Sequence, residues 1–118
     1  MEEPFQCAVV TCAALNLNGR YSLKLTRDGN MPPQAKSITA NKIRTIFRLA
    51  LRHYHNALVL GAFGCGAFRN PPEEMASIFK SVLNEDEFRN KFLLVTFAII
   101  EDHSSRNVNL RAFRKVFE

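Results

Sequence analysis

Three glycines stand close together in the stretch GAFGCGAFRNPP, residues 61–72. An apolar run, Ala57–Leu60, precedes this stretch, and its closing proline pair suits the first turn of a helix. Glycine permits backbone conformations that side chains forbid, so the N–H groups of such a turn can approach an anion closely. A helix directly behind the turn adds the positive end of its dipole. These residues predict a cradle for a phosphate group.

The glycines have a second explanation, which is that they only let a helix pack tightly against a strand. Two common nucleotide motifs are absent. GxxxxGK[ST] fails because Arg69 and Asn70 follow the last glycine, and GxGxxG fails because the string from Gly64 reads GCGAFR. A Walker-type nucleotide hydrolase is therefore not expected.

Strands and helices alternate in the elements that would position this turn. Continuous apolar strands are expected at 5–14, 57–60 and 92–100. Amphipathic helices are expected from a cap at Thr39 or Asn41 to about His55, from a cap at Asn70 through the apolar stripe that ends at Leu83, and from about Asn109 to Phe117. A long polar loop, about 19–39, joins the first strand to the first helix. This order predicts one α/β domain, 1–118, with a small, mostly parallel three-stranded sheet and covering helices.

Composition limits the classes of protein. Hydrophobic residues make up 47% and charged residues 23% of 118 residues, which is typical of a globular domain. Three cysteines without a CxxC pair argue against a disulfide framework and against a zinc site, so no metal is expected and a reducing compartment fits best. No apolar run approaches the roughly 20 residues that span a bilayer, and no targeting signal is visible. We expect a soluble protein, cytoplasmic by default.

The net charge is +5. Basic residues lie along two of the predicted helices and are interpreted mainly as solvated faces, the alternative being attraction to anionic ligands, acidic proteins or membranes. Nucleic-acid binding is not expected, because it needs basic clusters with stacking aromatic residues.

The stretch LVLGAFGCGAFRNPPEEMASIF, from Leu58 to Phe79, resembles the diphosphate-binding loop and following helix of the microbial-type poly(ADP-ribose) glycohydrolases, a branch of the macrodomain superfamily. AVVTCAALN at 8–16 resembles a strand of that family that ends in an apolar-Ala-Asn turn, and LLVTFAII at 93–100 resembles its last strand. The resemblance covers roughly 5–117 and corresponds to the carboxyl-terminal half, so it implies a truncated macrodomain-like fold.

This resemblance implies an ADP-ribose site. Gly64, Cys65 and Gly66 would offer backbone groups to the diphosphate, and Ala67 and Phe68 would line the distal ribose. Asn16 would lie near the same cleft, unless it is only a turn or cap asparagine. The ligand-binding residues implied are Asn16, Gly61, Gly64, Cys65, Gly66, Ala67, Phe68 and Arg69. No cofactor is implied.

The sequence departs from the family in its catalytic residues. The Gln-Glu-Glu motif that follows a glycine-rich loop in that family has no counterpart here. Glu101, Asp102 and His103 follow the last strand and would reach the same rim as the glycine turn. A carboxylate there can orient a ribose hydroxyl or assist departure from the anomeric carbon, and His103 can act near neutral pH. The alternative is a solvated polar loop.

Three hypotheses follow from these observations. The favoured one is an ADP-ribosylhydrolase that removes mono-ADP-ribose from a modified protein. The second is a non-catalytic reader of ADP-ribose, which needs only the cradle. The third is an interaction module whose exposed sheet edge is completed by a partner chain or by a second copy.

Overall fold

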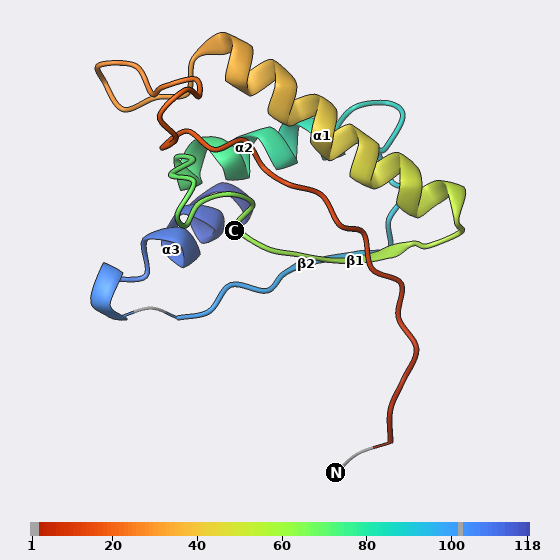
Figure 1. Ribbon diagram of the computed structural model, residues 1–118. Helices are drawn as coiled ribbons and strands as arrows, with labels where there is room; N and C mark the ends of the chain where they lie inside the picture. The colour runs from red at the N-terminus through yellow and green to blue at the C-terminus, as the bar shows by residue number, and fades with distance from the viewer. Residues whose placement is uncertain (1–2, 102) are drawn as a thin grey trace.

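The computed structural model describes residues 3–101 and 103–118 (Figure 1). Its elements, in chain order, are α1 (Pro33–Arg52), β1 (Ala57–Leu60), α2 (Pro72–Leu83), β2 (Leu94–Phe97), the short 3₁₀ helix η1 (His103–Ser105) and α3 (Val108–Phe117). β1 and β2 pair in parallel, with Ala57 opposite Leu94 and Leu60 opposite Phe97. The predicted α/β class with a parallel sheet and covering helices is confirmed.

α2 forms the crossover between the two strands, and it follows its local sequence signals. Pro72 opens the helix, and Glu73 and Glu74 lie in the first turn, where the helix dipole favours negative charge. The apolar stripe predicted for this helix is confirmed where Met75 and Phe79 are buried. The predicted cap is wrong, because the N-cap position is held by Pro71 and no side chain caps the helix.

α1 begins earlier than the sequence predicted. It starts at Pro33 rather than after Thr39 or Asn41, and it ends at Arg52, before His55. Ala35 and Thr39 belong to the same buried stripe as Ile43 and Phe47, so a continuous packed face carries the helix back to the prolines. The polar loop is correspondingly shorter than expected.

The sheet has two strands among the described residues, not the three predicted. Residues 5–14 form no strand, and no backbone hydrogen bond joins them to another described residue. The physical reason is that a strand needs a hydrogen-bonding neighbour, and no described strand runs beside this stretch. β2 is likewise confined to Leu94–Phe97 within the predicted 92–100, since its partner β1 has only four residues.

The core lies between the sheet and the helices, and Phe79 of α2 is its centre. Its ring contacts Phe47 of α1, Phe97 of β2 and Phe113 of α3, with ring centroids 6.4, 5.3 and 6.3 Å apart. Phe63 of the glycine turn packs on the same ring at 6.4 Å. The Phe79 side chain of α2 therefore connects the candidate site to α1 and α3. Within the described part of the chain, no helix is long and apolar enough to cross a membrane.

Candidate functional site

The glycine stretch folds into consecutive tight turns between β1 and α2. The Cys65 N–H donates to the Ala62 carbonyl at 3.1 Å, and the Arg69 N–H donates to the Gly66 carbonyl at 3.0 Å. The Asn70 N–H returns to the Gly64 carbonyl at 3.0 Å, which closes the loop on itself. The stretch is thus a compact loop at the carboxyl end of a parallel strand, where α/β sheets bind their ligands.

Gly64 is required by packing. Its φ is +67°, a left-handed conformation that favours glycine. A Cβ atom at this position would lie 2.5 Å from the Ala14 Cβ and 2.5 Å from Asn70 Nδ2. Gly66 differs, because a Cβ there would meet nothing within 4 Å and the residue is exposed. The two explanations of the glycines therefore apply to different residues. Gly64 is explained by close packing, whereas Gly66 leaves open space beside the turn.

Asn70 holds the N-terminal stretch against the glycine turn. Its side chain is 1% exposed, and Nδ2 donates to the carbonyl of Leu15 at 2.7 Å and to that of Gly64 at 2.9 Å. The Leu17 N–H adds a bond to the Phe68 carbonyl at 2.9 Å. Sequence reasoning missed this role, since it treated Asn70 as a helix cap.

Three successive N–H groups point to an anion site. The N–H groups of Gly66, Ala67 and Phe68 donate to no acceptor in residues 3–101 and 103–118. They border a cavity of about 360 Å³ that is lined by Cys12, Ala13, Ala14, Phe63, Gly64, Gly66, Ala67 and Phe68. Free backbone donors in successive residues can bind the oxygens of a phosphate.

Some of the other residues predicted to bind the ligand lie at this cavity and others do not. Asn16 accepts the Asn18 N–H through Oδ1 at 2.9 Å, which is the turn role left open as its alternative. Asn18, which the sequence did not single out, reaches the turn through Nδ2, 3.4 Å from the Ala67 carbonyl. Gly64, Gly66, Ala67 and Phe68 line the cavity of about 360 Å³, whereas Asn16, Gly61, Cys65 and Arg69 do not.

Cys65 was predicted to offer its backbone to the diphosphate, but its N–H is already donated to the Ala62 carbonyl and the residue does not line the cavity. The side chain packs against the hydrophobic core, and burial raises the pKa of the Cys65 thiol to about 12. It therefore stays protonated at neutral pH, so its thiolate is scarce. No group of three or more His, Cys, Asp or Glu side chains in the described residues is placed to hold a metal ion.

The predicted catalytic residues follow β2 at the same edge of the sheet. Glu101 and His103 are exposed, with Glu101 Oε2 3.8 Å from His103 Nε2. Neither lines the cavity beside the glycine turn. Asp102, the first choice for the acid, lies outside the described residues.

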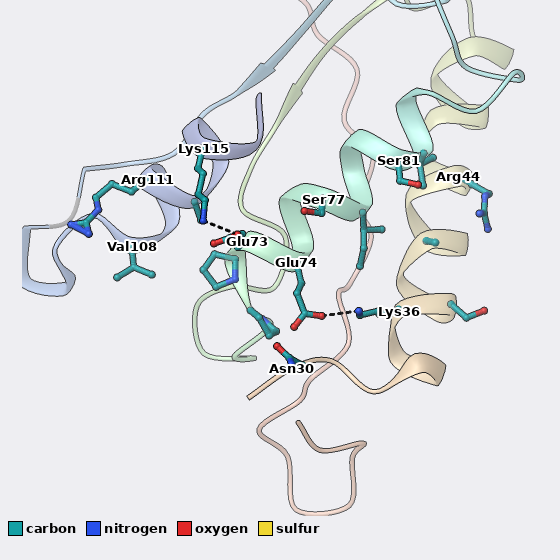
Figure 2. Close-up of a pocket in the computed structure, with 17 residues that line it drawn as sticks. Asn30, Lys36, Arg44, Glu73, Glu74, Ser77, Ser81, Val108, Arg111 and Lys115 are labelled. Atoms are coloured by element: carbon teal, nitrogen blue, oxygen red, sulfur yellow. Dashed lines mark hydrogen bonds and ion pairs between the residues drawn. The ribbon is translucent and has the colours of Figure 1, made fainter. Parts of the chain in front are cut away.

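A larger hollow lies elsewhere, between α1, α2 and α3 (Figure 2). This groove has a volume of about 1010 Å³, and four of its charged side chains pair across it: Lys36 with Glu74 at 3.3 Å and Lys115 with Glu73 at 3.1 Å. Glu74 also accepts the Met31 N–H at 3.1 Å. Since these polar groups already satisfy one another, we place the candidate site at the smaller cavity, whose donors are free.

Part of the basic face of α1 is neutralised by the loop after α2. Arg44 forms a two-pronged bond to Glu85, with Nη2 2.7 Å from Oε2, and Arg48 does the same to Glu87, with Nε 2.6 Å from Oε2. The Arg44 hydrogen bonds hold the pKa of the Glu85 carboxyl below its ordinary value. The basic face of α1 predicted to be solvated is thus partly exposed and also carries ion pairs.

A glycine turn with free N–H groups between a parallel strand and a helix is an arrangement in which an α/β unit can bind a phosphate group. No family model matches the chain, and no curated protein matches it.

Solved structures do match. Poly(ADP-ribose) glycohydrolase from Deinococcus radiodurans in complex with ADP-ribose is 37% identical over 73% of this chain, with a TM-score of 0.67. The enzyme from Thermomonospora curvata bound to the inhibitor ADP-HPD is 30% identical over 71% of this chain, with a TM-score of 0.66. The match covers 34% and 32% of those chains respectively, so this chain spans about a third of their length. The predicted resemblance to part of a microbial poly(ADP-ribose) glycohydrolase is confirmed.

Proposed function

We propose that this chain binds ADP-ribose, with the diphosphate on the N–H groups of Gly66, Ala67 and Phe68. The observation that carries the proposal is the set of three unused donors on a cavity directly before the start of α2. The solved complex of the Deinococcus enzyme with ADP-ribose supports the identity of the ligand. Phe68 and Ala13 would form apolar walls on either side of the ribose.

Isothermal titration calorimetry with ADP-ribose tests this proposal. Gly66→Glu places a carboxylate where the diphosphate would lie, so we expect loss of binding by at least about tenfold, since one hydrogen bond to a charged group is worth about 1.5–3 kcal/mol. Gln34→Glu adds the same charge to the exposed first turn of α1 and should bind like the unaltered chain. Equal affinity in the Gly66→Glu variant would refute the cradle.

We further propose that the bound ligand is mono-ADP-ribose attached to a protein, and that the chain hydrolyses this link. Water would attack the anomeric carbon, and the modified side chain would leave with a proton from an acid. The glycohydrolase activity named for the solved relatives supports this step, and Glu101, Asp102 and His103 are the candidate acids. The absent Gln-Glu-Glu motif favours the alternative, a reader that binds without cleavage.

Release of ADP-ribose from a mono-ADP-ribosylated protein separates the two functions. If the chain is a hydrolase, Asp102→Asn, Glu101→Gln or His103→Ala should lower the rate of release by about 10²–10⁴-fold, while calorimetry finds unchanged affinity. Binding without any release in the unaltered chain would make it a reader. Full release in all three variants would remove these residues from the mechanism.

A further inference from the structure

The outer face of the two-stranded sheet is exposed and mostly apolar, with Thr96 of β2 as its polar member opposite Val59. Val59 of β1 points away from the core, as do Leu94 of β2 and Leu93 and Ile100 beside it, and these side chains are between 60% and 89% exposed. Soluble proteins rarely leave a continuous apolar sheet face in water. Within residues 3–101 and 103–118, each strand also pairs with only one other strand, so each has a free edge.

Residues 5–14, here called the N-terminal arm, likewise lack backbone hydrogen-bond partners among the described residues and expose apolar side chains. The arm has the sequence of a buried strand, yet no backbone hydrogen bond joins it to another described residue. Phe5 is 86% and Val9 80% exposed. Figure 1 shows this stretch, in red, as an extended trace whose part toward the N-terminus runs away from the helices. An extended apolar segment with unpaired backbone groups is suited to adding a strand to another sheet.

Both surfaces lack charge. No Asp, Glu, Lys or Arg occurs from Pro4 to Gly19, from Asn56 to Phe68, or from Phe92 to Ile100. The 16 basic and 11 acidic residues of the chain lie outside these three stretches. Two copies, each with a net charge of +5, can therefore meet on this side without bringing like charges together.

We propose that the occupant of this face is a second copy of the chain, docked by exchange of the N-terminal arms. The end of the arm lies on the β1 side, where Ala14 packs against Gly64. A two-fold axis there would place the arm of each copy along the free edge of the other copy's β1, with the uncovered sheet faces in contact. The arm, residues 5–14, and the two strands of four residues each comprise 18 residues per copy, close to the lower end of the roughly 20–30 residues a side of a standard interface.

Such an interface is isologous, since the same arm and the same edge are used by both copies. In this interface the backbone of each arm forms hydrogen bonds with a neighbouring strand, and each sheet gains a third strand. The proposal does not require ADP-ribose binding, but the end of the arm, at Cys12, Ala13 and Ala14, also lines the cavity beside the glycine turn.

Sedimentation equilibrium of the unliganded chain measures the association directly. We expect a mass of twice 13.4 kDa at micromolar concentration. Val9→Lys in the arm and Val59→Lys on the sheet face should each raise the dimer dissociation constant by at least about tenfold, since each buries an unpaired charge. Leu49→Lys, on the partly exposed side of α1, is the matched control and should leave the constant unchanged.

Amide hydrogen exchange tests the arm itself. In the dimer, amides within 5–14 should exchange at least about tenfold more slowly than in the monomeric Val59→Lys variant, because a ladder protects them. Circular dichroism of each variant confirms that α1 to α3 stay folded. A chain that is monomeric up to millimolar concentration, including one that pairs only with a different polypeptide, would overturn the proposal. So would a dimer in which the arm amides stay unprotected or the Val59→Lys variant associates normally.

Discussion

Replacing Gly64 by alanine should destabilise the fold more than any other change of one methyl group in the glycine turn. A side chain at φ +67° costs about 1–2 kcal/mol in a left-handed conformation. The added Cβ would also lie 2.5 Å from Asn70 Nδ2, so the Asn70 amide must move and lose its bonds to Leu15 and Gly64. Each lost bond costs about 0.5–1.5 kcal/mol. The total is about 2–5 kcal/mol, a large share of the roughly 5–15 kcal/mol typical of a domain.

Urea unfolding followed by circular dichroism measures this loss, and Gly66→Ala supplies the control. The new methyl group at Gly66 would meet nothing within 4 Å, so the free energy of unfolding should change by less than about 0.5 kcal/mol. Gly64→Ala should also release the N-terminal stretch, because Asn70 holds Leu15 against the turn. If both variants unfold at the same urea concentration, the packing argument for Gly64 is wrong.

Two further predictions concern the core and its charged rim. Phe79→Ala should lower the free energy of unfolding by about 3–5 kcal/mol, because it removes a ring that is 1% exposed. Phe117→Ala, on the exposed end of α3, should lower it much less. Equal urea midpoints of the two variants would contradict this prediction. The lowered pKa of Glu85 gives stability that is present above the ordinary carboxyl pKa of 4.5 and is lost as the pH falls through the lower, folded value. The thermal midpoint of a Glu85→Gln variant should therefore fall less steeply between pH 5 and 3 than that of the unaltered chain. The corresponding difference in the free energy of unfolding should be less than about 1 kcal/mol, since the ion pair is partly exposed. If the slope is unchanged, other groups cause the loss of stability in acid.

Local sequence signals predicted the elements that depend on nearest neighbours. Pro72 and the acidic pair behind it mark the start of α2 within the sequence itself, and the apolar run at β1 is bounded by polar residues and glycine. The start of α1 was missed because Ala35 and Thr39 are buried by contacts with distant elements, which no local pattern records. The strand expected at 5–14 fails for a related reason, since strand pairing depends on a distant segment lying alongside, which no local pattern records.

For the candidate site as well, the local turn was predicted from the sequence and its distant support was not. The glycine spacing indicated a turn that leaves backbone groups free, and the structure has free donors at Gly66, Ala67 and Phe68. Its support could not be predicted, because Asn70 reaches the carbonyl of Leu15, 55 positions earlier in the chain. One local signal was available in the sequence. Asn70 stands directly before Pro71 and Pro72, and in the structure Pro71 holds the N-cap position, so the asparagine side chain is free for another role.

The different burial of two cysteines gives the site a built-in chemical reporter. The Cys65 thiol, with its pKa raised to about 12, is nearly inert toward alkylating reagents at neutral pH. Cys12 is also free, and it lines the cavity beside the glycine turn. Mass spectrometry after brief treatment with iodoacetamide would therefore read occupancy of the cavity as slower modification of Cys12, with exposed Cys7 as the internal standard. Ligands can thus be screened on the unaltered chain without a label.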